Sequence, residues 1–260
     1  MPTVLPLLPG LVSVTFRKLS PAEVIELARR SGLTGIEWGG DVHVPHGDEA
    51  LAASIGEMTR SAGLQVSAYG SYFRAGHSEQ EGLPFAKVLA SARALGAPVI
   101  RIWAGTRGSA ASDEAHREWV VRECRRVAAL AAEAGVRVAL EFHGNTLTDT
   151  LDSTRRLLES VDHPNLRSLW QPVNGTPVAG RLEELRVLEP WLEHVHVFNW
   201  SAAGQRLPLE PGGDLWRPCL QWLKKSKPGC AVLLEFVEGD HPESCVRDGA
   251  TLGSWIQGLD

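Results

Sequence analysis

Acidic, amide and imidazole side chains stand at the ends of several short apolar segments of this sequence. The segment VRVALEFH, residues 136–143, leads through apolar positions into Glu141 and His143. Later segments carry Gln171, His196 and Glu235 in similar positions. An ionised carboxylate inside an apolar strand costs on the order of several kcal/mol unless it is paired or bound to a metal. One such residue alone is usually structural, but four of them in successive segments favour a functional site.

Together these side chains form a mixed set of oxygen and nitrogen donors. Two carboxylates, one amide oxygen and one imidazole suit a divalent Mn²⁺, Mg²⁺, Co²⁺ or Zn²⁺ ion better than a soft metal. We therefore predict a metal site formed by Glu141, Gln171, His196 and Glu235. Because side chains alternate between the two faces of a strand, His143 shares a face with Glu141 and is a candidate substrate contact or partner of a ligand.

The elements that must position these residues alternate along the chain. Eight short apolar segments resemble strands, and a segment able to form a helix follows each one. The predicted strands cover residues 11–16, 34–38, 64–70, 98–105, 136–143, 166–172, 194–200 and 231–237. Eight such units in 260 residues predict an α/β fold, a single (β/α)8 TIM barrel with a parallel eight-stranded barrel and outer helices. A doubly wound open sheet is the alternative.

Two of the expected helices carry their own boundary signals. Ser20 and Glu23 form the pattern of a capping box, and Gly32 suits the left-handed position after the last turn. Between Asp113 and Gly135, apolar residues recur at spacings of four and three and predict a long amphipathic helix. With no linker or charge block in the sequence, we predict one domain over residues 1–260, with its site at the carboxyl ends of the strands.

Composition narrows the class of protein. The net charge is −5, and this mild acidity argues against nonspecific binding of nucleic acid. The four cysteines form no close pair and are expected to be reduced thiols in a cytoplasmic protein. The N-terminal segment has no basic region before its apolar residues, and no apolar run approaches the roughly 20 residues of a membrane span. We expect a small-molecule substrate and no membrane partner, and homo-oligomerisation stays open.

Five motifs resemble one known family of barrels, and together they span most of the chain. They are GLTGIEWGGD (32–41), IRIWAGTRGS (100–109), LEFHGNTLTDT (140–150), HVHVFNW (194–200) and LLEFVEGD (233–240). In order and spacing they are similar to the xylose isomerase-like TIM barrel superfamily, specifically its sugar phosphate isomerase/epimerase group. The resemblance implies one divalent metal held by Glu141, the strand-6 position Gln171, His196 and Glu235.

Two residues depart from the pattern of that family. Gln171 stands where the family usually has aspartate, so the site loses one negative charge and its metal affinity should fall and depend more on substrate oxygens. Asn174 stands where epimerases and endonuclease relatives often have histidine. The endonuclease relatives collect three zinc ions with many His and Asp residues, whereas this chain has Tyr69 and Trp103 at the ends of its third and fourth predicted strands, so a role in DNA repair is disfavoured.

The resemblance implies a metal-dependent isomerase or epimerase of a sugar or sugar phosphate. The reaction would pass through an enediolate, with Glu141 and Glu235 as the acid/base pair. Further candidate substrate contacts are Glu37, Trp38, His43, Trp103, Asn174 and Trp200, besides His143. Three alternatives stay open: an inosose dehydratase-like enzyme, a hydroxypyruvate isomerase-like enzyme, and a non-catalytic sugar-binding relative.

Overall fold

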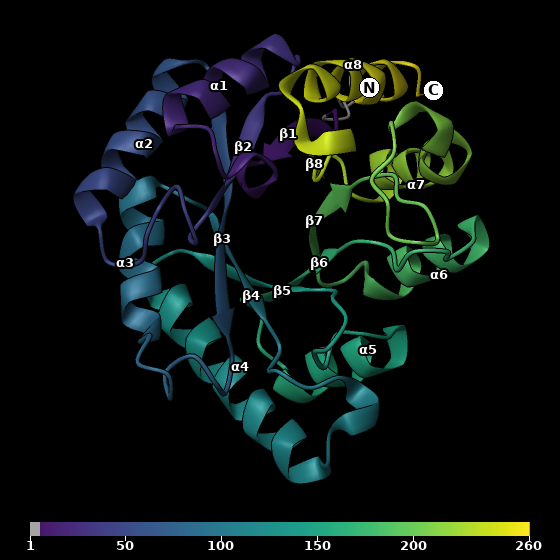
Figure 1. The fold of residues 1–260 in the computed structure, drawn as a ribbon. Helices are drawn as coiled ribbons and strands as arrows, with labels where there is room; N and C mark the ends of the chain where they lie inside the picture. The colour runs from purple at the N-terminus through teal and green to yellow at the C-terminus, as the bar shows by residue number, and fades with distance from the viewer. Residues whose placement is uncertain (1–5, 260) are drawn as a thin grey trace, which may run out of the picture.

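Eight parallel strands pair in sequence order in the computed structural model, which describes residues 6–259, and β8 closes the ring against β1 (Figure 1). The strands are β1 (Leu8–Val12), β2 (Gly35–Gly39), β3 (Gln65–Arg74), β4 (Val99–Trp103), β5 (Arg137–Glu141), β6 (Leu166–Trp170), β7 (Leu192–Val197) and β8 (Ala231–Leu234). The predicted TIM barrel is confirmed. Pairing of Leu8 with Ala231 rules out the open sheet, because an open sheet has two unpaired edges.

Within the described residues, eight α-helices surround the barrel (Figure 1). They are α1 (Pro21–Arg30), α2 (Glu49–Ser61), α3 (Phe85–Leu95), α4 (Glu114–Glu133), α5 (Leu151–Val161), α6 (Val178–Leu188), α7 (Gly213–Ser226) and α8 (Pro242–Gln257). The capping box at Ser20 is confirmed, since its hydroxyl accepts from the backbone of Glu23 while the Glu23 carboxylate accepts from Ser20. Gly32 has a φ of +68°, as expected after the end of α1.

The first predicted strand ends earlier than expected. Residues 11–16 read as one strand, but β1 stops at Val12, and Ser13–Phe16 forms a short 3₁₀ helix, η1. The hydroxyl groups of η1 explain the turn, because Ser13 Oγ accepts from the backbone N–H of Gly39, and Thr15 Oγ1 accepts from that of Phe236. These two bonds tie η1 to the ends of β2 and β8 at the mouth of the barrel.

The third strand instead runs four residues beyond its predicted end at residue 70. A bulge between Gly70 and Phe73 interrupts its pairing with β4, and Tyr72 within the bulge has a φ of +55°. Such bulges re-aim side chains near functional sites. Here the bulge brings Tyr72 to the wall of the cavity at the barrel mouth.

The core consists of apolar residues between the barrel and the helices, and the barrel interior differs from it. One interior layer holds Ala68, Val99, Ala139 and Leu169. At the mouth, charged and imidazole side chains replace the branched apolar residues that usually fill such barrels. No helix within residues 6–259 is long and apolar enough to cross a membrane.

Candidate active site

A cavity of about 420 Å³ lies at the carboxyl ends of the strands. Seven of the residues predicted for the site line it: Trp103, Glu141, His143, Gln171, Asn174, Trp200 and Glu235. They come from the ends of β4 and β5 and from the loops after β5, β6, β7 and β8. The fold therefore brings together residues that lie more than 130 positions apart in the sequence, because parallel strands end at the same rim.

A buried arginine in the wall of this cavity joins two carboxylates. Arg101, in the middle of β4, has 1% of its surface exposed. Its Nε donates to Glu37 Oε1 at 2.7 Å, and its Nη1 donates to Glu141 Oε2. Burial lowers the pKa of Arg101, but the charges of Glu141 and Glu37 outweigh this effect and raise it well above its usual value. Arg101 is therefore a permanent cation within the barrel.

Glu141 accepts hydrogen bonds from three side chains. Besides Arg101, the indole Nε1 of Trp103 donates to Oε2, and Gln171 Nε2 donates to Oε1 at 2.9 Å. Burial raises the pKa of Glu141, but Arg101 and nearby imidazoles outweigh it, so the pKa lies below the usual value. A carboxylate held ionised in this way is a good ligand for a cation and a poor proton acceptor.

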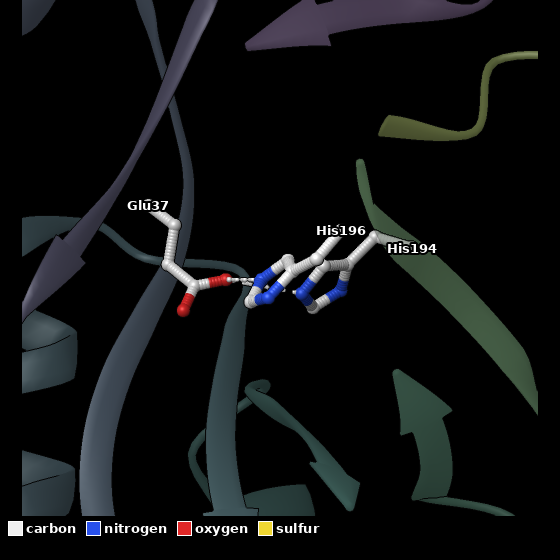
Figure 2. A group of neighbouring side chains, drawn as sticks. All are labelled: Glu37, His194 and His196. Carbon is white, nitrogen blue, oxygen red and sulfur yellow. Dashed lines mark hydrogen bonds and ion pairs between the residues drawn. The ribbon is translucent and has the colours of Figure 1, made fainter. Parts of the chain in front are cut away.

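The two histidines of β7 share one partner. The Nε2 atoms of His194 and His196 each lie 3.1 Å from Glu37 Oε2, and Figure 2 shows both rings directed at this carboxylate. Glu37 is fully buried, and burial raises its pKa, but Arg101 and His196 together bring it well below the usual value. An ionised carboxylate only accepts, so each Nε2 carries the proton.

His196 presents its other nitrogen to Glu235. Nδ1 lies 3.3 Å from Glu235 Oε2, but it makes no hydrogen bond within the described part of the chain. Burial lowers the pKa of His196, while Glu235 and Glu37 raise it to about 10 in the absence of a metal. The imidazole Nδ1 and the carboxylate thus lie side by side with a cation required between them, either a proton or a metal ion.

Two groups of residues could hold a metal. Ligand atoms of Glu37, His194 and His196 lie within 4.8 Å of one another, but these atoms already pair among themselves (Figure 2). In the predicted set, Gln171 Oε1 and His196 Nδ1 are buried atoms without hydrogen bonds among residues 6–259, and Nδ1 can bind a metal once that metal displaces its proton. Glu37 behind His196 is the kind of carboxylate that fixes a metal-binding imidazole. The predicted set therefore fits a hard divalent cation.

Aromatic side chains form the walls of the cavity. His143 stacks on Trp103 with ring centres 4.9 Å apart, and the guanidinium of Arg74 lies over that indole, 3.9 Å from the ring centre. His143 Nδ1 lies 2.7 Å from the carbonyl oxygen of Gly144, so Nδ1 donates, and in the neutral ring Nε2 is the nitrogen with the lone pair. Another part of the wall consists of Phe198, Trp200 and Phe236.

Three predicted substrate contacts lie away from the cavity. Glu37 is fully buried and bonded to Arg101 and both histidines, so it supports the site rather than touching a substrate. Trp38 is also fully buried, and its indole donates to Thr59 of α2 on the outer side of the barrel. His43 is 3% exposed and bonds to Ser13 and to the backbone of Leu19. These placements correct the assignment of all three.

Sequence reasoning missed Arg101 and Tyr72. An arginine within the apolar run PVIRIW carries the same signal as a glutamate within VALEFH, namely a charge that must find a buried partner. Tyr72 gave no comparable signal, because only the bulge in β3 turns it toward the cavity.

The fold and these motifs agree with a family model. The model for the xylose isomerase-like TIM barrel matches residues 25–255. The chain belongs to this family. Its members carry different activities, so membership alone does not assign a reaction to this chain.

Two similarities point to the same named activity in other proteins. A segment of 118 residues, 43% of this chain, is 39% identical to a 3-dehydroshikimate dehydratase of Bacillus anthracis, and the match spans 40% of that relative. The crystal structure of the probable 3-DHS dehydratase AsbF from Bacillus anthracis is similar with a TM-score of 0.78. It is 23% identical, with coverage of 95% of this chain and 99% of that one.

A D-allulose 3-epimerase from Methylomonas sp. is also similar, with a TM-score of 0.71 and 15% identity over 98% of this chain and 99% of that one. At these identities the two solved structures show the fold alone. The named relatives are enzymes, and they include both a dehydratase and an epimerase.

Proposed function

We propose that this chain is a dehydratase acting on a small polyoxygenated ketone, with 3-dehydroshikimate as the first candidate substrate. The 39% identity to a 3-dehydroshikimate dehydratase favours this reaction over others of the family. The observation that carries the proposal is that Glu141, Gln171, Glu235 and His143 line one cavity, with Gln171 Oε1 buried and unpartnered among residues 6–259 and with His143 Nδ1 donating to Gly144. A base near the carbon and a Lewis acid on the carbonyl oxygen together assist removal of a proton next to a carbonyl.

The ligand residues have defined roles in this proposal. Glu141, Gln171, His196 and Glu235 would hold one divalent cation. When bound, that cation supplies a Lewis acid for the carbonyl oxygen of the substrate. Trp103 and Arg101 hold Glu141 ionised and in place, and Glu37 keeps the proton of His196 on Nε2.

His143 is the proposed proton carrier. Its Nε2 would take the proton from the carbon next to the carbonyl, and a double bond forms as the hydroxyl leaves the following carbon. His143 returns that proton to the departing hydroxyl, so one water molecule is released and the imidazole is regenerated. Glu141 is less suited to this role than expected from the sequence, because three donors and a lowered pKa weaken it as a base.

The ring ketone formed by loss of water becomes aromatic by moving a proton from a ring carbon to the carbonyl oxygen. The test is turnover of 3-dehydroshikimate with added Mn²⁺ or Mg²⁺, followed by ultraviolet absorbance of that aromatic product and by NMR. His143→Gln should lower turnover by about 10²- to 10⁴-fold while leaving metal binding unchanged. His241→Gln, at an exposed position, is the matched control and should behave as the wild type. Wild-type turnover in His143→Gln would contradict the role of His143, and no product from the wild type with either metal would contradict the substrate.

Isomerisation or epimerisation of a sugar is the second candidate. Glu141 and Glu235 both line the cavity, so two carboxylates are available to the same substrate. In D₂O, an epimerase or isomerase would incorporate deuterium into a ketose at the carbon next to its carbonyl. Deuterium exchange and a new sugar signal by NMR, without dehydration of any cyclic ketone, would favour this candidate.

A further inference from the structure

We propose that Arg17 orients the substrate by binding its carboxylate, so that the opposite edge of the ring faces the residues proposed to hold the cation. This inference rests on the proposed function, because it takes the cavity at the barrel mouth as the substrate site and 3-dehydroshikimate as the substrate. It goes further by naming the residue that holds the end of the ring away from the carbon that loses the proton.

Arg17 carries the accessible guanidinium of this cavity within the described part of the chain. The residue follows η1 at the end of β1, lines the cavity, and has 42% of its side chain exposed. The other arginine of the lining, Arg101, is 1% exposed and is bound to Glu37 and Glu141. An anionic group that enters the cavity can therefore reach Arg17, whereas Arg101 is closed to it.

Three partners hold the guanidinium of Arg17 before any ligand binds. Its Nε donates to Asp41 Oδ2 at 2.6 Å, its Nη1 to the carbonyl oxygen of Val14 at 3.0 Å, and its Nη2 to the hydroxyl of Tyr72 at 2.9 Å. Because arginine has five N–H donors, each terminal nitrogen keeps one N–H for another acceptor. Two donors on one rigid plane match the two oxygens of a carboxylate.

The backbone of Tyr72 supports this role for Arg17. Tyr72 lies in the bulge of β3 with a φ of +55°, in the left-handed region that a bulky residue rarely adopts. Strain of this kind persists only where the surrounding structure requires it, and it is concentrated at functional sites. Here it places the phenol hydroxyl at Arg17 and the ring edge-on against Trp103 of the same cavity.

Arg17 and two of the proposed cation ligands come from opposite parts of the barrel. In the closed order of eight strands, β5 stands opposite β1 and β7 stands opposite β3. Arg17 follows β1 and Tyr72 belongs to β3, whereas Glu141 belongs to β5 and His196 to β7. A ring that binds the cation through its carbonyl oxygen can therefore extend toward Arg17. In 3-dehydroshikimate the carboxylate lies across the ring from the carbon that loses the proton, which suits this orientation.

Two measurements on the Mn²⁺-loaded full chain test the proposal. Calorimetry gives the dissociation constants of 3,4-dihydroxybenzoate and catechol, which share two adjacent oxygens, while only the first carries a carboxylate. The ratio of these constants is the preference for a carboxylate. Relaxation of the ring protons by Mn²⁺, followed by NMR, gives the orientation of bound 3,4-dihydroxybenzoate, because this effect falls steeply with distance from the ion.

The variants separate the charge of Arg17 from its geometry. Arg17→Met removes the charge, and Arg17→Lys keeps the charge but loses the planar pair of donors. Lys18→Met is the matched control, because Lys18 is an exposed cation next to Arg17 in the chain and does not line the cavity.

The wild type should prefer 3,4-dihydroxybenzoate to catechol, and Arg17→Met should reduce this preference about tenfold or more, the contribution typical of a hydrogen bond to a charged group. Arg17→Lys should fall between the two. Lys18→Met should change the preference by less than about twofold, because salt screens an exposed charge outside the cavity. In the wild type, the ring proton that neighbours only a hydroxyl-bearing carbon should relax faster than the one that neighbours only the carboxylate-bearing carbon.

An unchanged preference in Arg17→Met would overturn the proposal, as would an equal loss in Lys18→Met or a wild type that binds neither ring. Faster relaxation of the proton beside the carboxylate would also overturn it, because the carboxylate would then lie at the cation. If Arg17→Met does not fold, Arg17→Lys is judged by the same ratio. Absence of turnover of 3-dehydroshikimate contradicts the proposed reaction alone, because binding and orientation are measured without turnover.

Discussion

Replacing Arg101 by methionine removes the only described side chain that bridges Glu37 and Glu141. Methionine has a similar length and no charge, so the variant tests the ion pairs more than the packing. Arg101 is 1% exposed, and both carboxylates are nearly or fully buried. Removing one partner of a buried ion pair costs about 3–5 kcal/mol, because the remaining charge stays buried without compensation. We expect the free energy of unfolding of metal-free Arg101→Met to be lower than that of the wild type by about 3–5 kcal/mol.

Hydrogen bonds from other side chains remain at both carboxylates, so the loss of unfolding free energy should not exceed about 5 kcal/mol. Glu37 keeps its bonds from His194 and His196, and Glu141 keeps those from Trp103 and Gln171. The free energy of unfolding can be measured with urea in the presence of EDTA, following tryptophan fluorescence. Added Mn²⁺ should restore part of the loss, since a cation at Glu141 replaces some of the missing charge.

Arg137→Met is the matched control for this experiment. Arg137 also belongs to a barrel strand and pairs with Glu193, but 43% of its side chain is exposed. An ion pair at such a position contributes about 1 kcal/mol or less. A loss in Arg101→Met no larger than the loss in Arg137→Met would refute the reasoning that the buried network stabilises the barrel. If Arg101→Met is insoluble, Arg101→Lys, which keeps the charge but only part of the geometry, should lose less.

Three further predictions concern the pH response, the interior and the first helix. Because the pKa of His196 is raised to about 10, a proton competes with the metal for this imidazole. The affinity for Mn²⁺ should therefore rise about tenfold per pH unit up to that pH, and binding near neutral pH should release about one proton. Calorimetry in two buffers measures both quantities, and an affinity that does not change with pH would contradict the prediction. Gly70→Ala would place a Cβ 2.5 Å from Arg101 Nη2 and should cost about 1–3 kcal/mol, whereas Gly253→Ala, in open space on α8, should be neutral or stabilising. Ser20→Ala should cost about 1 kcal/mol in urea unfolding through loss of the capping box, and equal stability to the wild type would show that the cap contributes little.

Sequence patterns within a few consecutive residues predicted the helices and strands whose formation depends on residues close together in the chain. The capping box at Ser20 and the apolar stripe of α4 are properties of a few consecutive residues, and both are found where expected. Eight alternations of strand and helix were enough for the barrel, because parallel neighbours require crossover helices. The early end of β1 was missed since the hydroxyls of η1 bond to strands that are distant in sequence.

The sequence by itself determined the barrel and the residue types at its mouth, because strand alternation and the charge of a residue are local facts. Only the tertiary structure decided how those charges pair. Glu37 lies beneath the histidines of β7, Arg101 lies between two carboxylates, and Gln171 donates to Glu141. The contacts of Glu37 cross the barrel interior from β2 to β4 and β7, strands that do not pair with β2, so no spacing in the chain encodes them.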